Sequence, residues 1–126
     1  NMGLEAARGT WVGFVDSDDW TAYDMYEKLV RKAEETGADV VGCDYNMTSV
    51  QSMQIGKVVP NNTMDQTGIL NRDKYALLVM NPGSMVIKIY AREVIEVNHL
   101  RFPEKTFYED NCASPIWMLH FTHFER

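Results

Sequence analysis

The chain has 126 residues, of which 45% are hydrophobic, so it can form one compact domain with a modest core. Its formal net charge of −6 lacks the excess of Lys and Arg that binding to nucleic acid or to an anionic membrane requires. No apolar run approaches the roughly 18 residues of a membrane span. Cys43 and Cys112 match no metal-ligand or redox spacing, which favours free thiols in a cytoplasmic protein.

The first predicted elements are a short helix and a strand. Residues 2–7 have the composition of a helix, which ends at Gly9, and residues 11–15 (WVGFV) form a strand rich in aromatic and β-branched residues. Three carboxylates follow this strand immediately.

The next predicted elements are a helix and a buried strand. Thr21 and Asp24, three residues apart, predict a capping box, and Gly37 is the expected C-terminal cap of the same helix. Residues 39–43 (DVVGC) then read as a buried strand. The order strand, helix, strand predicts a parallel βαβ unit with a right-handed crossover.

The middle of the chain is less regular. Residues 46–68 are polar and rich in Gly, Asn and Thr, which predicts a β-hairpin or a loop. Asn71 is the predicted cap of a helix that runs to about Met80. Residues 85–90 (MVIKIY) alternate as a strand does, and residues 91–97 predict a short helix.

The last segment, from Tyr108 onward, has the composition of a helix. Pro115 interrupts it, so we expect either a kink or a second helix with Ser114 as its cap.

The carboxylates after the first strand are the clearest candidate site. They are Asp16, Asp18 and Asp19, and ligands of open α/β sheets bind beyond the carboxyl ends of the strands. Asp16 and Asp18 can face one point from a tight turn, where a hard divalent cation such as Mg²⁺ would relieve their repulsion and recruit a phosphorylated ligand. Alternatively, the turn caps a helix that begins near Ala22, and the protein is a non-catalytic acidic interaction module.

Two other motifs can be tested on the same residues. An EF-hand loop is excluded, because Trp20 offers no oxygen ligand and Thr21 stands where glycine is needed. A Mg²⁺-dependent phosphatase of the haloacid dehalogenase type would use Asp16 as nucleophile and Asp18 as acid/base. It is the weaker alternative, because that family has Thr or Val at the Trp20 position and its downstream lysine and acidic pair are not found.

Several motifs in the same order resemble a family 2 glycosyltransferase of the GT-A fold. Residues 1–20 (NMGLEAARGTWVGFVDSDDW) resemble its Asn-x-Gly helix, its Ala-x-Gly turn and its Asp-x-Asp motif, and residues 38–46 (ADVVGCDYN) resemble its next strand. Residues 85–104 resemble its K-x-Y-x-R and F-P-E region, and residues 108–111 (YEDN) are similar to its Glu-Asp motif. The resemblance covers nearly the whole chain except residues 46–70.

The resemblance implies a partial GT-A fold of the α/β class, with a parallel or mixed sheet and flanking helices. It implies an inverting, metal-dependent transfer of a sugar from a nucleotide-diphosphate sugar, foremost a UDP-sugar, to a saccharide or another hydroxyl acceptor, with bacterial cell-surface polysaccharide as the expected acceptor. Asp18 and Asp16 would bind Mn²⁺ or Mg²⁺ and the donor, with Asp19 assisting. Asp110 would be the general base that takes the proton of the acceptor hydroxyl.

The family pattern also places strands and nucleotide-binding acidic residues ahead of Asn1. We therefore expect residues 1–126 to form a single, truncated GT-A catalytic module, with residues 46–70 as a variable loop or hairpin. Such a module can be inactive alone, and its exposed sheet edge would favour a homo-oligomer. The expected location is the cytoplasm, with the inner face of the membrane as the alternative.

Overall fold

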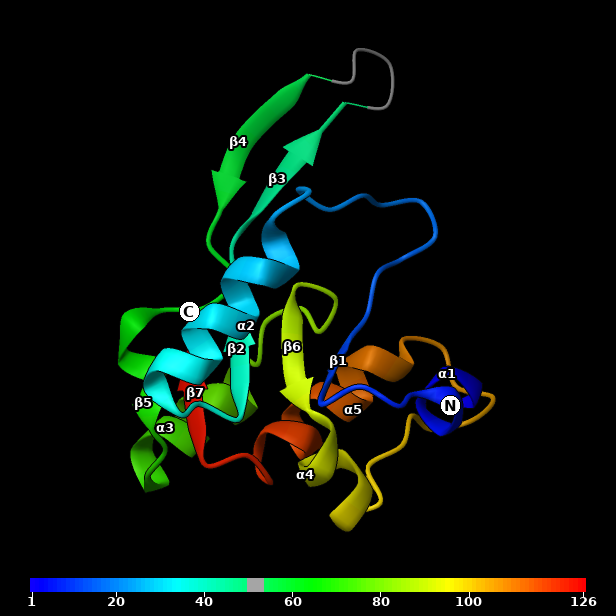
Figure 1. The fold of residues 1–126 in the computed structure, drawn as a ribbon, viewed down its shortest axis with the longest axis vertical. Helices are drawn as coiled ribbons and strands as arrows, with labels where there is room; N and C mark the ends of the chain where they lie inside the picture. The colour runs from blue at the N-terminus through cyan, green and yellow to red at the C-terminus, as the bar shows by residue number, and fades with distance from the viewer. Residues whose placement is uncertain (50–53) are drawn as a thin grey trace.

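The computed structural model describes residues 1–49 and 54–126, and it contains a five-stranded mixed sheet and a separate two-stranded hairpin (Figure 1). The order in the large sheet is β1-β6-β2-β7-β5; β2 and β7 are parallel, and the other neighbouring pairs are antiparallel. The strands of this sheet are β1 (Trp11–Gly13), β2 (Val40–Gly42), β5 (Gly68–Ile69), β6 (Lys88–Ala91) and β7 (His123–Glu125). The predicted α/β class with a mixed sheet is confirmed.

Helices cover both faces of the sheet. In Figure 1, α2 lies in front of the sheet, and α3 and α5 lie behind it. The helices are α1 (Met2–Ala6), α2 (Met25–Thr36), α3 (Arg72–Met80), α4 (Arg92–Val97) and α5 (Glu109–Met118), with one 3₁₀ turn, η1 (Met64–Gln66). None of them, within the described ranges, has the length and apolar character needed to cross a bilayer.

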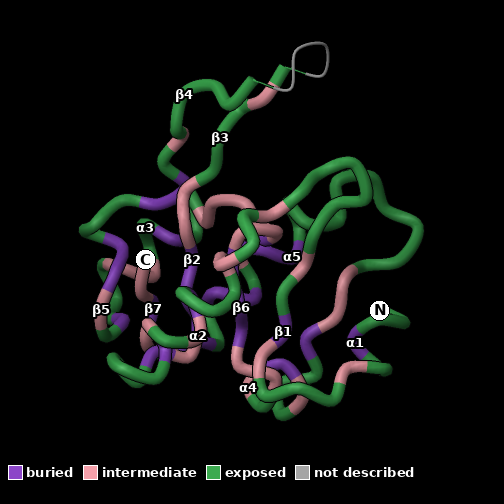
Figure 2. The backbone as a smooth tube through the Cα atoms, turned by 45° about the horizontal axis from the view of Figure 1, so that its top comes forward, coloured by how far each residue is buried: buried purple, intermediate pink, exposed green. Residues whose placement is uncertain are grey.

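Alternation along the strands divides the core into two layers. On the face toward α5, Tyr90 of β6 lies in register with Val12 of β1 and Val40 of β2, and Val40 lies beside Phe124 of β7. These four residues belong to the larger core, together with buried side chains of α3, α4 and α5. The opposite face packs Val41 and other side chains against α2 (Figure 2 shows the buried centre).

The two strands of the predicted βαβ unit are parallel, and a third strand lies between them. Both β1 and β2 run antiparallel to β6, so they are parallel to each other, but β6 lies between them. Three residues of β6, Lys88 to Tyr90, are almost fully buried, as expected for an interior strand that is covered on both faces.

The predicted capping box at Thr21 is not observed. Helix α2 begins at Met25 with Asp24 as the N-cap, and the cap makes no side-chain hydrogen bond. The Asp24 carboxylate pairs instead with Lys28 at 2.7 Å, so it does not reach back toward Thr21. The other end agrees with the prediction, because Gly37 caps the helix with φ +74°, a left-handed conformation that glycine adopts without strain.

The middle segment forms the predicted hairpin, with β3 (Tyr45–Thr48) paired to β4 (Ile55–Val59). Residues 50–53 lie outside the described residues. The hairpin projects from the body of the molecule (Figure 1), and most of its residues are exposed. The predicted cap of α3 is confirmed, because the Asn71 side chain accepts a hydrogen bond of 3.0 Å from the Lys74 amide.

The C-terminal segment excludes one of the two predicted alternatives. Pro115 lies inside α5, so no second helix begins at Ser114. The helix continues past the proline because Trp117 and Met118 are buried in the core, and this packing offsets the loss of one backbone hydrogen bond. After α5 the chain turns into β7, which the composition of the segment did not indicate.

Candidate active site

The acidic turn begins three residues after β1 ends. The Asp19 amide donates a hydrogen bond of 3.1 Å to the Asp16 carbonyl, which closes a four-residue turn. Asp16, Asp18 and Asp19 are all exposed. Five residues separate this turn from Met25, the first residue of α2, so the turn does not cap that helix. The helix cap on which the alternative of an acidic interaction module is based is therefore not observed.

The second acidic segment is the first turn of α5, which contains Glu109 and Asp110. Tyr108 occupies the N-cap position with φ +57°, a left-handed conformation that is uncommon for a bulky residue, and its side chain makes no capping bond. Asp110 is the second residue of the helix rather than its cap. The positive end of the helix dipole favours carboxylates here.

An aromatic cluster packs the residue just before the acidic turn against α5. Phe14, two residues before Asp16, packs edge-on against Phe102 and Trp117, with ring centroids 5.3 and 6.0 Å apart. Trp117 lies on α5, and it also meets Tyr90 of β6 at 5.7 Å. Phe14 is thereby held against Trp117 in the last turn of α5, and the acidic turn begins two residues after Phe14.

The surroundings of Asp16 raise the pKa of its carboxyl. Slight desolvation raises the pKa of the exposed Asp16 carboxyl, and the negative charges of Asp19, Asp18, Asp110 and Glu109, in decreasing order, raise it further. Two segments about 90 residues apart in the sequence thus both contribute to the negative potential at Asp16. A cation bound there would be attracted by all of these carboxylates.

The residue types fit a hard divalent cation such as Mg²⁺ or Mn²⁺, since they offer carboxylate oxygens. Within the described ranges, no group of three or more His, Cys, Asp or Glu side chains is arranged to hold a metal ion. This is compatible with Mg²⁺, which usually binds one or two carboxylates and completes its shell with water and substrate phosphates.

Other motif residues connect the segments around the site. The Asn1 side chain exchanges two hydrogen bonds with the backbone of Phe102, of 3.0 and 2.9 Å. The Arg92 guanidinium donates to the Gly9 carbonyl at 2.6 Å. These contacts join α1, the Ala-x-Gly turn, α4 and the F-P-E segment, so Asn1 and Arg92 have structural roles in this arrangement.

Lys88, from the K-x-Y-x-R motif, is fully buried in β6. Its Nζ donates to the carbonyls of Pro82 at 2.9 Å and Ser84 at 2.7 Å. Burial lowers the pKa of Lys88 to about 7, while the nearby Cys43 acts in the opposite direction. A neutral amine keeps two N–H groups, which matches the two carbonyls.

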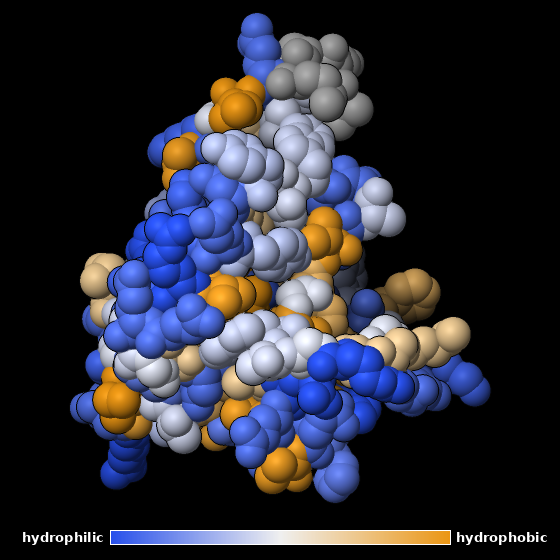
Figure 3. Space-filling model, in the orientation of Figure 1, coloured by the Kyte–Doolittle hydropathy of each residue, from blue (hydrophilic) through white to orange (hydrophobic). Residues whose placement is uncertain are grey.

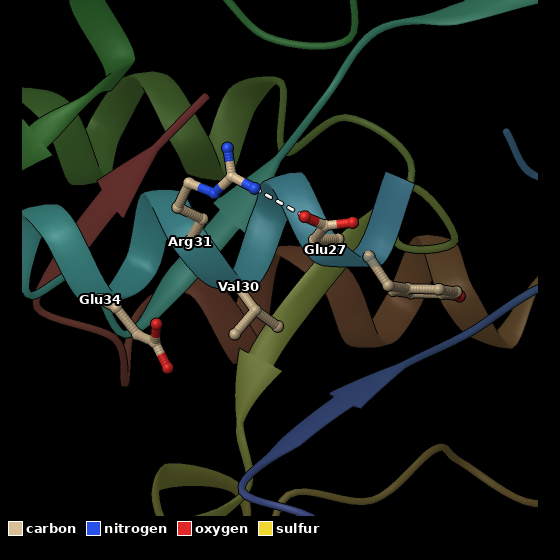
Figure 4. A pocket seen from close by; sticks show the side chains of 5 residues that line it. Glu27, Val30, Arg31 and Glu34 are labelled. Atoms are coloured by element: carbon tan, nitrogen blue, oxygen red, sulfur yellow. Dashed lines mark hydrogen bonds and ion pairs between the residues drawn. The ribbon is translucent and has the colours of Figure 1, made fainter. Parts of the chain in front are cut away.

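The outer face of α2 carries a separate surface hollow (Figure 4). Its five lining residues all belong to α2, and the Arg31 guanidinium pairs with Glu27 at 2.6 Å across it. Figure 3 shows hydrophilic side chains gathered over this helix. Exposed ion pairs of this kind contribute little to stability, and none of the predicted site residues lines the hollow.

Sequence reasoning named Asp16, Asp18, Asp19 and Asp110 and missed two residues of this region. Glu109 contributes to the charge around Asp16, and its place beside Asp110 in the YEDN segment was the available signal. Phe14 has no signal of its own in the sequence, since an aromatic residue at a strand end is compatible with many packings.

Comparisons with known proteins agree with this fold. Residues 1–95 match the family described as "Glycosyl transferase family 2". The chain is 30% identical over 128 residues to the uncharacterized glycosyltransferase EpsJ of Bacillus subtilis, and 25% identical over 114 residues to the succinoglycan biosynthesis protein ExoO of Rhizobium meliloti. These alignments cover 100% and 82% of this chain and 37% and 31% of the relatives.

Among solved structures, residues 1–349 of TarS from S. aureus match with a TM-score of 0.68 and 26% identity. The match covers 98% of this chain and 35% of that chain. The same TarS segment in complex with UDP-GlcNAc matches with a TM-score of 0.72 at 23% identity, over 98% of this chain and 34% of that one.

The mixed sheet, its flanking helices and the match to TarS define a glycosyltransferase fold of the GT-A type. This chain belongs to glycosyl transferase family 2. It spans about a third of the length of the relatives it matches, so what those proteins do as wholes is treated below as a proposal.

Proposed function

We propose that this chain carries part of the active site of an inverting, metal-dependent glycosyltransferase. The observation that supports it most is the group of carboxylates in the turn at residues 16–19, to whose negative potential at Asp16 the charges of Asp110 and Glu109 in the first turn of α5 add. A site of this charge suits a divalent cation together with the diphosphate of a nucleotide-sugar donor.

In this proposal Asp18 and Asp16 bind Mn²⁺ or Mg²⁺, and Asp19 supports them. The metal, when bound, offsets the charge that develops on the diphosphate as it leaves. Asp110 accepts the proton of the acceptor hydroxyl while the hydroxyl oxygen forms the new bond to the anomeric carbon, and the electron pair of the broken bond leaves with the diphosphate. The position of Asp110 in the first turn of α5, beside the acidic turn, supports this role.

The donor is proposed to be a UDP-sugar, since TarS, a structural neighbour, has been solved with UDP-GlcNAc. The acceptor is proposed to be a saccharide of a bacterial surface polysaccharide, and the name of ExoO supports polysaccharide synthesis. Both cysteines are free, which suits a cytoplasmic location or the inner face of the membrane. We also propose self-association through β1, the terminal strand of the described sheet.

Calorimetric titration tests the donor site. UDP and UDP-GlcNAc are titrated into the protein with Mn²⁺ and, separately, with EDTA, and the titrations are repeated on Asp18→Ala and on Asp65→Ala, which removes an exposed carboxylate from η1. We expect binding that requires Mn²⁺, that Asp18→Ala abolishes and that Asp65→Ala leaves unchanged. Binding that persists in EDTA, or that both variants weaken equally, would refute the metal role of the acidic turn.

A further inference from the structure

The loop at residues 82–84, which precedes β6 in the chain, accepts hydrogen bonds from side chains of both β6 and α5. Lys88 Nζ donates to two carbonyls of this loop, those of Pro82 and Ser84. From the other side, the Ser114 hydroxyl of α5 donates to the Gly83 carbonyl at 3.3 Å. Three consecutive carbonyls are therefore held by two side chains from two elements.

The same loop is fixed along a second side by the segment at residues 61–62. The Ser84 amide donates to the Asn61 side chain at 2.7 Å, and the Asn62 side chain donates to the Pro82 carbonyl at 3.3 Å. Gly83 has φ +68°, and a Cβ at this position would lie 2.7 Å from the Asn61 side chain. The loop has little freedom to move, so it can transmit the position of Lys88 to its neighbours.

The first turn of α5 needs such an anchor. Pro115 has no N–H, so it cannot donate to the carbonyl of Asn111, and the first turn is less firmly bonded to the rest of the helix. Ser114 lies four residues after Asp110 and therefore on the same side of the helix. A side-chain bond at Ser114 thus restrains the helix one turn from Asp110.

We propose that Lys88 is a positioning residue for Asp110, acting through the carbonyls of the 82–84 loop and the hydroxyl of Ser114. Lys88 does not touch the reacting atoms in this scheme. Lys88 fixes the position of the loop, the loop fixes the position of Ser114, and Ser114 restrains the first turn of α5. The inference rests on the role proposed above for Asp110.

The test uses the whole chain and measures release of UDP from UDP-GlcNAc, together with calorimetric binding of UDP in Mn²⁺. Lys88→Met keeps the side-chain length and removes both donors, and Ser114→Ala removes the hydroxyl. Lys74→Met is the matched control, because Lys74 also donates to a backbone carbonyl, that of Thr67, away from the 82–84 loop.

We expect Lys88→Met to lower kcat by roughly tenfold, since small displacements of a reacting group are costly, while the Kd for UDP stays within about twofold. Ser114→Ala should also lower kcat, and the double variant should be no slower than Lys88→Met, because both act through one loop. Lys74→Met should leave kcat unchanged. Retention of kcat in Lys88→Met, or losses that multiply in the double variant, would overturn the proposal.

Hydrogen exchange separates this inference from the proposed function. If the unmodified protein neither binds UDP nor releases it, the proposed function fails, and exchange of the amides at residues 109–112 still tests the linkage. Lys88→Met and Ser114→Ala should both speed that exchange, with β3 unaffected as an internal reference. Should Lys88→Met not fold, Ser114→Ala carries the test alone. Unchanged exchange in the first turn of α5 would refute the linkage.

Discussion

Asp16 lies among the negative charges of the site, and its ionisation affects both metal binding and the free energy of unfolding. Burial and four neighbouring carboxylates raise its pKa, so its ionised form is disfavoured in the folded protein. When a carboxyl has a higher pKa in the folded than in the unfolded protein, the free energy of unfolding falls as the pH rises from the unfolded to the folded pKa value. The loss remains at higher pH. A bound cation reverses that loss.

Asp16→Asn should therefore stabilise the metal-free protein at pH 7 and have little effect near pH 3. The gain should be on the order of 0.5 kcal/mol or less, because water and salt screen exposed charges. Thermal unfolding at both pH values and low ionic strength measures it. Mn²⁺ should raise the Tm of the unmodified protein more than that of Asp16→Asn. A variant that is less stable than the parent at pH 7 would contradict this account of the cluster.

Lys88 makes the opposite contribution to the pH dependence. Its pKa of about 7 lies below the value of 10.5 that it has when unfolded, so between these values the unfolded chain binds a proton that the folded chain does not. The contribution of Lys88 to the free energy of unfolding therefore rises with pH, by on the order of 2 kcal/mol from pH 7 to pH 9.

Urea denaturation at pH 7, 8 and 9 tests this, with Lys88→Met as the comparison. Cys43 is the titratable neighbour that acts on Lys88, and Lys88 in turn lowers the pKa of the Cys43 thiol, so both proteins are also compared in the Cys43→Ser background. The unmodified protein should gain stability relative to Lys88→Met as the pH rises. Parallel curves would mean that Lys88 stays charged in the folded protein.

At the scale of elements, local signals were more informative than long-range ones. The cap at Asn71, the glycine at position 37 and the alternation of the β6 segment predicted elements that the structure contains. The insertion of β6 between β1 and β2 was not predictable, because strand order depends on pairing between distant segments. The three-residue strand β7 was missed because so short a run has no usable periodicity.

At the scale of elements, Phe14 packs against Trp117 of α5 and holds the chain just before the acidic turn. Phe14→Ala should destabilise the protein by about 2 kcal/mol, less than a fully buried phenylalanine would, because Phe14 is half-buried. It should also lower the pKa of Asp16 toward its ordinary value, as the turn becomes more solvated and moves away from Asp110 and Glu109. Carboxyl titration by NMR measures the pKa, and Tyr23→Ala, at a fully exposed ring, is the control. An unchanged Asp16 pKa in Phe14→Ala would show that the packing does not set the proximity.

At the scale of the whole molecule, the fold class and the acidic turn were predictable from the ordered motifs, and the composition of the site was predictable in part. The link between the acidic turn and α5 depends on aromatic packing among Phe14, Phe102 and Trp117, which lie in three separate segments. No local pattern specifies such packing, so the sequence named the carboxylates without bringing them together.

The terminal position of β1 in the sheet leads to a prediction about assembly. Strand β1 pairs with β6 on one side, and an unpaired edge is a template for another strand. Sedimentation equilibrium of this 126-residue chain over a range of concentrations should show a reversible dimer. A single species at the monomer mass of 14.5 kDa throughout the range would contradict self-association through β1.

The central claim is that the acidic turn and the first turn of α5 form one site for a divalent cation and a diphosphate. Paramagnetic broadening of backbone amide signals by Mn²⁺ in the presence of UDP tests it most directly, because the effect falls steeply with distance from the ion. We predict broadening at residues 16–20 and at residues 109–112 together, lost from both in Asp18→Ala. Broadening at one segment without the other, or at the outer face of α2 instead, would contradict the claim.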